Sequence, residues 1–270
     1  MKAGYFKLED PIVQTSLESL AHFGKDGPIL VGGLAIQLHA EGRPSFSRGT
    51  PDADLLSFAP QSYESFSQEM VPTLVPFFKS QGYAVQPKRG RLNNTLKVIK
   101  DQNKPHQKLF LMHWTQFSPE VYEDFQDYVA QQIAFAKPFV LRSSEKAIHA
   151  VALEELLPLK VQRCRRYGTQ RESVVGPLYS TLIENAEHGN WGTLAQLPLL
   201  DWKKGIEHMQ ERVIDSGNAE EISTYKLSKD LYDIGCAARV ISDSITSFDK
   251  DRYEANVQRI VHRQQDLIAP

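Results

Sequence analysis

The sequence predicts an α+β protein: a mixed sheet flanked by helices, followed by an all-helical C-terminal region. Two observations carry this prediction. Short apolar runs bounded by glycine, proline and asparagine alternate with helix-length amphipathic segments in the first part of the chain. From Ser173 onward, no segment has the composition of a strand. We therefore expect an α+β domain over residues 1–150 and a helical domain over residues 151–270.

The first domain is expected to begin with a helix and a short buried strand that ends at Gly32 and Gly33. A second helix, a loop and a second strand follow, and Pro72 and Pro76 are expected to interrupt the next helix. Three strand-like segments then predict an antiparallel meander. The expected elements are helices at 11–23, 34–40, 61–79 and 119–136, and strands at 29–31, 53–58, 83–86, 95–100, 108–114, 140–141 and 148–151.

The second domain is expected to contain helices alone. Apolar residues recur at helical spacing in each of its segments, and no strand pattern interrupts them. The expected helices cover 153–166, 174–188, 202–215, 224–243 and 250–267.

The bulk composition favours a folded cytoplasmic protein. No stretch approaches the ~20 apolar residues of a membrane span, and the N-terminus lacks the apolar segment of a signal peptide. Cys164 and Cys236 lie far apart, without metal-ligand spacing, and are expected to be reduced thiols.

Positive charge is concentrated in two stretches, although the net charge of the chain is only -2. Residues 88–108 contain seven basic residues and one acid, Asp101, and residues 160–171 contain five basic residues and no acid. Such segregation can attract a polyanion such as RNA, and the alternative is two solvated faces.

Gly32 and Gly33 stand where a strand is expected to pass into a helix. Glycine allows close approach of the backbone to a ligand, and the N–H groups at a helix start favour an anion. The alternative is a tight turn required by packing.

Asp52 and Asp54 open the next expected strand, so both carboxylates should lie on one face of it. Two carboxylates this close repel each other unless a cation lies between them, and Mg²⁺ prefers oxygen ligands. The pair suggests phosphoryl-group chemistry on a nucleotide, with two surface acids as the alternative.

Two features of the helical domain add charged groups. Lys160 lies near the apolar edge of the helix at 153–166, where it can reach a phosphate or extend to solvent. Asp230 and Asp233 are three residues apart, hence on one helical face.

These features, in this order, resemble the minimal, polymerase-β-like nucleotidyltransferase superfamily and within it the AbiEii-type toxin and abortive-infection family. The family has an apolar strand with a glycine pair, then Arg-x-Thr-x-Asp-x-Asp, a helix with a lysine, and Lys-Asp-x-Tyr-Asp. The matching residues here are Val31-Gly32-Gly33, Arg48-Gly49-Thr50-Pro51-Asp52-Ala53-Asp54, Glu154-Glu155-Leu156 with Lys160, and Lys229-Asp230-Leu231-Tyr232-Asp233.

The resemblance implies that Asp52 and Asp54 bind Mg²⁺ (or Mn²⁺) and that Gly32 and Gly33, with Arg48 and Thr50, line the triphosphate of an NTP. It further implies that Lys160 contacts the phosphates or helps to select the nucleotide, and that Asp230 is a base or a substrate-positioning group. The reaction would transfer an NMP to an acceptor hydroxyl of RNA, tRNA or protein. Family members are often toxins with a cognate antitoxin.

One departure concerns the third carboxylate that polymerase-like enzymes place on a later strand. The expected strand at 108–114 has no acid, and His113 occupies the corresponding position. A histidine there can act as a base, or mark a loss of activity. Three hypotheses therefore remain: transfer to RNA or protein, an antibiotic-type enzyme acting on small molecules, and an inert nucleotide-binding partner protein.

Overall fold

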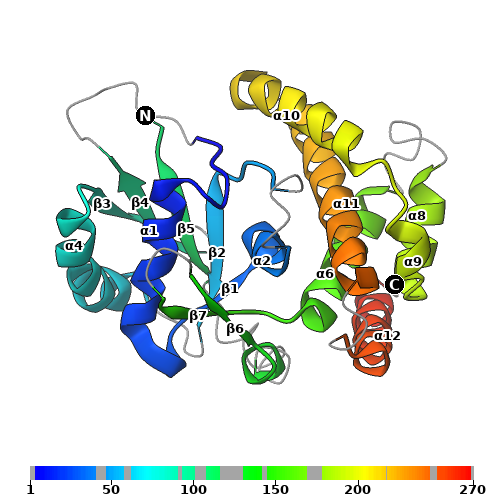
Figure 1. The fold of residues 1–270 in the computed structure, drawn as a ribbon, viewed down its shortest axis with the longest axis horizontal. Helices are drawn as coiled ribbons and strands as arrows, with labels where there is room; N and C mark the ends of the chain where they lie inside the picture. Colours follow the sequence, from blue (N-terminus) through cyan, green and yellow to red (C-terminus); the bar gives the residue numbers. More distant parts are fainter. Residues whose placement is uncertain are drawn as a thin grey trace. The chain divides into compact units, whose positions relative to one another are not determined.

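The computed structural model describes residues 4–40, 47–57, 62–90, 93–100, 108–115, 130–141, 145–168, 178–216, 218–243 and 248–268. The chain forms two compact units (Figure 1). The first consists of Met1–Leu38 and Arg48–Ala152, and the second of His39–Ser47 and Leu153–Pro270. All strands of the described residues belong to the first unit. The α+β class with a helical C-terminal region is confirmed.

The first unit is organised around a seven-stranded mixed sheet with the order β3-β4-β5-β2-β1-β7-β6. The predicted meander is confirmed, because β3, β4 and β5 pair antiparallel. β2 then pairs parallel with β5 and antiparallel with β1. The strands are β1 (Ile29–Val31), β2 (Asp52–Leu56), β3 (Ala84–Arg89), β4 (Asn93–Ile99), β5 (Phe110–Thr115), β6 (Lys137–Val140) and β7 (Ala147–Ala150).

Helices cover one face of this sheet. α1 (Pro11–Leu20) packs on β5 and β7, and α4 (Val71–Ser80) packs on β3. The core side chains of this face alternate with half-buried ones along β2 and β5, as the period of two in a strand requires. The buried side chains of the face that α1 and α4 cover are Ala53, Leu55, Phe110, Met112 and Trp114. In Figure 1, α2 (Gly32–His39) lies on the other side of the sheet from α1 and α4.

The helix predicted over 61–79 is interrupted, but by a π-helical turn that ends two residues before Pro72 rather than at its prolines. It comprises α3 (Tyr63–Ser65), the π-helical turn η3 (Phe66–Met70) and α4. Pro72 lies in the first turn of α4, where its missing N–H costs nothing, and Pro76 is accommodated inside α4. Most of the helix predicted at 119–136 lies outside the described residues, and 130–134 are helical.

The second unit packs its helices around α11 (Ala219–Asp243), which contacts α6 (Leu153–Gly168), α9 (Trp191–Leu194) and α10 (Leu199–Ser216). α12 (Lys250–Ile268) and α8 (Leu178–Glu187) pack on α6. The short helix α9 was not predicted.

The first unit also contains the 3-10 helix η1 (Ala21–Asp26), which follows α1. Among the described residues, no helix is long and apolar enough to cross a membrane.

Candidate active site

The aspartate pair stands at the beginning of β2, in the centre of the sheet. Asp52 and Asp54 are both partly exposed, whereas Ala53 between them is fully buried. This alternation places both carboxylates on the face of the strand opposite the face that α1 and α4 cover. The side chain of Asp52 is 27% exposed, so it can reach a ligand from solvent.

Gly32 lies directly against this pair. Val31 is the register partner of Asp54, so the chain leaves β1 beside the second carboxylate and enters α2. Gly32 has φ +73, and a Cβ atom added to it would lie 2.5 Å from Oδ2 of Asp54. Both its conformation and its contact therefore require glycine. Gly33 follows in the first turn of α2, so backbone N–H groups of a helix start lie next to the pair.

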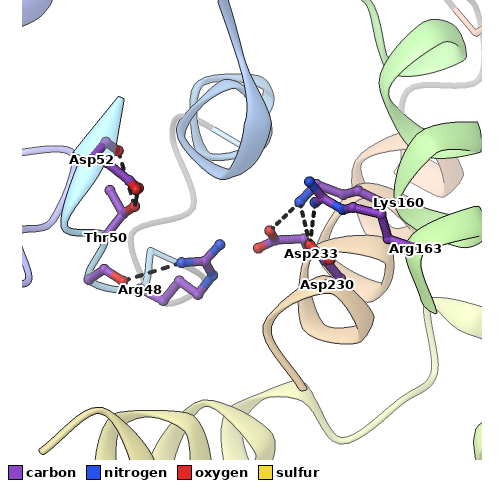
Figure 2. A network of polar contacts seen from close by, with 8 residues as sticks. Arg48, Thr50, Asp52, Lys160, Arg163, Asp230 and Asp233 are labelled. Carbon is purple, nitrogen blue, oxygen red and sulfur yellow. Dashed lines mark hydrogen bonds and ion pairs between the residues drawn. The ribbon is translucent and has the colours of Figure 1, made fainter. Parts of the chain in front are cut away.

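Thr50 orients Asp52. Its Oγ1 lies 3.1 Å from Oδ1 of Asp52 and 3.1 Å from the Asp52 carbonyl oxygen (Figure 2). The backbone of Thr50 is held by Phe6, through N–H···O bonds of 2.9 Å and 2.8 Å. Arg48 is buried, and its Nη1 donates to the Gly49 carbonyl at 3.3 Å. Within the predicted motif, Thr50 therefore has a clear structural role, because its hydroxyl fixes the rotamer of Asp52.

His113 lies on β5 in register with Asp54, on the same face as the pair. Its Nε2 is 3.8 Å from Oδ2 of Asp52, and its Nδ1 is 2.9 Å from Oγ1 of Thr95. Thr95 is the register partner of His113 on β4 and is buried. The sequence analysis identified His113 but missed Thr95. Pairing the strands of the predicted meander in register would have placed Thr95 beside His113.

The donor set at this site fits a cation that is shared with a substrate. Mg²⁺ bound by one or two carboxylates usually completes its shell with water and substrate phosphates. Asp52 and Asp54 supply such carboxylates. Among the described residues, no group of three or more histidine, cysteine, aspartate or glutamate side chains could hold a metal by itself. The two carboxylates are therefore at most part of a cation's ligand shell, and a bound substrate or water would have to complete it.

The other predicted site residues form a buried ionic cluster within the second unit. Nζ of Lys160 lies 2.9 Å from Oδ1 of Asp230 and 2.8 Å from Oδ2 of Asp233 (Figure 2). Nη2 of Arg163 lies 2.7 Å from the same Oδ1 of Asp230. The side chain of Lys160 is only 1% exposed. The cluster joins α6 to α11, and the helical spacing correctly predicted that both aspartates share a face.

The electrostatics of the cluster keep Asp230 ionised. Burial by itself raises the pKa of Asp230, but the charges of Lys160 and Arg163 outweigh burial, so the pKa is lowered. A carboxylate with a lowered pKa is a weaker proton acceptor, which favours a positioning role for Asp230 over that of a base. The phosphate contact expected of Lys160 stays a prediction.

The two basic stretches differ in how far acids neutralise them. In the stretch at 160–171, Lys160 and Arg163 pair with aspartates, and Nε of Arg165 lies 2.8 Å from Oε1 of Glu187. The side chains of Arg166 and Arg171 lie outside the described residues. In the stretch at 88–108, the described basic side chains form no ion pair with another described residue; these are Lys88, Arg89, Lys97, Lys100 and Lys108.

Comparison with known proteins gives one distant likeness. No protein-family model matches the chain, and no curated protein matches it by sequence. A solved structure, described as an antigenic nucleotidyltransferase-like protein from Paracoccidioides brasiliensis, matches with a TM-score of 0.39 and 18% identity, over 61% of this chain and 71% of that chain. A likeness of this size carries no argument about activity. The resemblance to the AbiEii-type family stays a prediction.

Proposed function

We propose that this protein is a metal-dependent nucleotidyltransferase that moves an NMP from an NTP to an acceptor hydroxyl. The observation that carries the proposal is the aspartate pair on one half-exposed face of β2, with the Gly32 backbone pressed against Asp54. A carboxylate pair beside a helix start combines ligands for a cation with N–H groups for the phosphates that the cation accompanies.

In the proposed reaction, the acceptor oxygen forms a bond to the α-phosphorus of the NTP. The bond between that phosphorus and the bridging oxygen breaks, and pyrophosphate leaves with the electron pair. Mg²⁺ or Mn²⁺, when bound, would neutralise phosphate charge and favour ionisation of the attacking hydroxyl.

The side chains of the site have distinct roles in this scheme. Asp52 and Asp54 would hold the cation, and Thr50 keeps Asp52 in position. Gly32 and Gly33 would line the triphosphate. In the tautomer whose proton is on Nδ1, His113 donates a hydrogen bond from Nδ1 to Oγ1 of Thr95. Its Nε2 is then free of a proton and can accept the proton of the acceptor hydroxyl.

The acceptor is proposed to be RNA, tRNA included, with protein as the alternative acceptor. The described basic residues at 88–108, which form no ion pair with another described residue, favour a polyanion over a cationic small molecule such as an antibiotic. A toxin role in the cytoplasm, opposed by a cognate antitoxin, is the physiological setting that the AbiEii resemblance suggests.

The test is transfer of α-³²P from each of the four NTPs, with Mg²⁺, to total RNA and to protein. We expect label on one kind of acceptor with one NTP, and its loss in Asp52→Ala and in Asp54→Ala. A variant of either aspartate that transfers label as fast as the wild type would overturn the metal assignment.

A second candidate function is an inert nucleotide-binding partner protein. It is favoured by His113, which stands where polymerase-like enzymes have a third carboxylate. This candidate predicts NTP binding in calorimetry with no label on any acceptor.

A further inference from the structure

The face of the sheet that carries the aspartate pair continues across the meander. Cross-strand partners point to the same face of a sheet, so the register identifies the side chains that share it. Two rows cross from the edge strand to β2. The first is Lys88, Thr95, His113 and Asp54, and the second is Gln86, Lys97, Leu111 and Asp52.

Both lysines of these rows are available at the surface. Lys88 is exposed and Lys97 is partly exposed, whereas Leu96 and Val98 on the opposite face of β4 are buried. With neighbouring strands about 4.8 Å apart, Lys97 stands about 10 Å from Asp52 and Lys88 about 14 Å from Asp54, backbone to backbone. No aspartate or glutamate occurs in β3, β4 or β5, so no acid of these three strands lies beside the two lysines.

The other described lysines of the stretch lie elsewhere. Lys100 and Lys108 line a separate cavity of about 340 Å³, together with Phe6, Tyr83 and Asp10. Arg89, in register with Asn94 and Trp114, lies on the opposite face of the sheet. Among the described basic residues of the stretch, Lys88 and Lys97 are therefore the two that share a face with the aspartate pair.

We propose that this face, defined by Lys88 and Lys97 with Gln86 and Thr115, binds the phosphate backbone of a single-stranded RNA acceptor whose end reacts at the aspartate pair. The position of the reacting end rests on the proposed function. Lysine meets phosphate as a point charge, and phosphate contacts position a strand without reading its sequence. Of the β3, β4 and β5 side chains that share this face, none is phenylalanine, tyrosine or tryptophan, and His113 is the one aromatic ring on which a base could stack. Binding should therefore depend strongly on salt and weakly on base sequence.

The test is the affinity of the full-length protein for labelled oligouridylate and oligoadenylate, measured by fluorescence anisotropy across a KCl series without NTP. We compare Lys88→Gln/Lys97→Gln with the charge-matched control Lys100→Gln/Lys108→Gln. Each phosphate contact contributes about 0.7 to the slope of log K against log salt for a single strand. The first variant should lower the magnitude of that slope by about 1.4, and the control should leave it unchanged.

Two outcomes overturn this proposal: wild-type salt dependence in Lys88→Gln/Lys97→Gln, or an equal loss in both variants. Thermal unfolding verifies that both variants are folded, and the single variants Lys88→Gln and Lys97→Gln should each give about half the effect. Because binding is measured without NTP, the two proposals fail separately. RNA binding that needs Lys88 and Lys97, without any transfer, refutes only the transferase; transfer to protein without RNA binding refutes only this face.

Discussion

The molecule contains two aspartate pairs whose surroundings differ. Asp52 and Asp54 lie on a strand, and Asp52 is 27% exposed with His113 at 3.8 Å as its nearest titratable partner among the described residues. Asp230 and Asp233 lie on a helix, are 7% and 2% exposed, and both contact Lys160. The helical pair is neutralised by its own chain, whereas Asp52 has no lysine or arginine partner within the described residues.

The difference shows that pattern alone does not distinguish a ligand site from an ionic lock. A carboxylate pair that the fold supplies with its own cations is satisfied, and its main effect is to join two helices. A carboxylate pair left partly exposed, beside a glycine that brings backbone N–H groups close, can be reached by a ligand from solvent. Variants at both aspartate pairs test whether the exposed pair serves activity and the buried pair serves stability.

The largest effect is expected from Asp52→Asn. If Asp52 holds the cation of the proposed reaction, loss of its carboxylate should lower nucleotidyl transfer by roughly a thousandfold or more, equivalent to about 4 kcal/mol. Thermal stability should stay close to that of the wild type, because the side chain is partly exposed. Transfer rate and melting temperature are measured on the same preparation, with Asp201→Asn, an exposed aspartate of α10, as the control. A large drop in melting temperature with unchanged transfer would reverse the contrast.

Lys160→Met should act on stability. It removes the charge that both buried aspartates contact, and breaking a buried ion pair from one side costs about 3–5 kcal/mol. Urea unfolding measures this loss. The double variant Lys160→Met/Asp233→Asn should recover part of it, because one uncompensated charge is removed. If Lys160→Met instead unfolds like the wild type but no longer transfers nucleotide, the cluster serves catalysis and the predicted phosphate contact gains support.

Gly32→Ala tests the contact between backbone and carboxylate. The left-handed conformation at φ +73 costs an alanine roughly 1–2 kcal/mol, and its Cβ would displace the Asp54 carboxylate. Gly82→Ala is a matched control, because Gly82 has φ +77 but open space around the added Cβ. Both variants should lose similar stability in urea unfolding, and only Gly32→Ala should lose metal-dependent NTP binding in calorimetry. Equal NTP binding by both would remove Gly32 from the site.

A third buried carboxyl, Glu155, belongs to the segment Glu154-Glu155-Leu156 that the sequence analysis placed in the lysine motif. Glu155 of α6 is buried and lies 3.0 Å from Nε of Arg252 on α12, with Glu154 and Asn256 beside it. Burial, opposed by Arg252 and assisted by Glu154, raises the pKa of Glu155 from 4.5 to about 7. The folded state then binds more protons than the unfolded state, so stability falls as pH rises from about 4.5 to about 7.

Glu155→Gln should flatten that part of the pH dependence. Melting temperatures at about pH 5 and about pH 8 measure it, and Glu184→Gln, on the exposed side of α8, is the control that should behave like the wild type. An unchanged difference between the two pH values in Glu155→Gln would assign the dependence to another group.

Much of the fold could be predicted from the sequence because it follows from local periodicity. The meander, the strand at Ile29–Val31 and the long helices were predicted from alternation and from helical spacing. The π-helical turn before Pro72 and the short helix α9 were not, because each depends on packing rather than on local propensity. The same-face placement of Asp52 and Asp54 followed from a strand period of two.

The sequence by itself determined the fold class, the position of the glycine pair and the presence of two aspartate pairs and two basic stretches. Only the tertiary structure decided which charges neutralise one another. Lys160 and Arg163 meet aspartates about seventy residues away along the chain, whereas Lys88 and Lys97 meet no acid among the described residues. The physical reason is that an ion pair depends on distance in space, and the distance between segments far apart in sequence is set by strand register and helix packing, which local pattern does not encode.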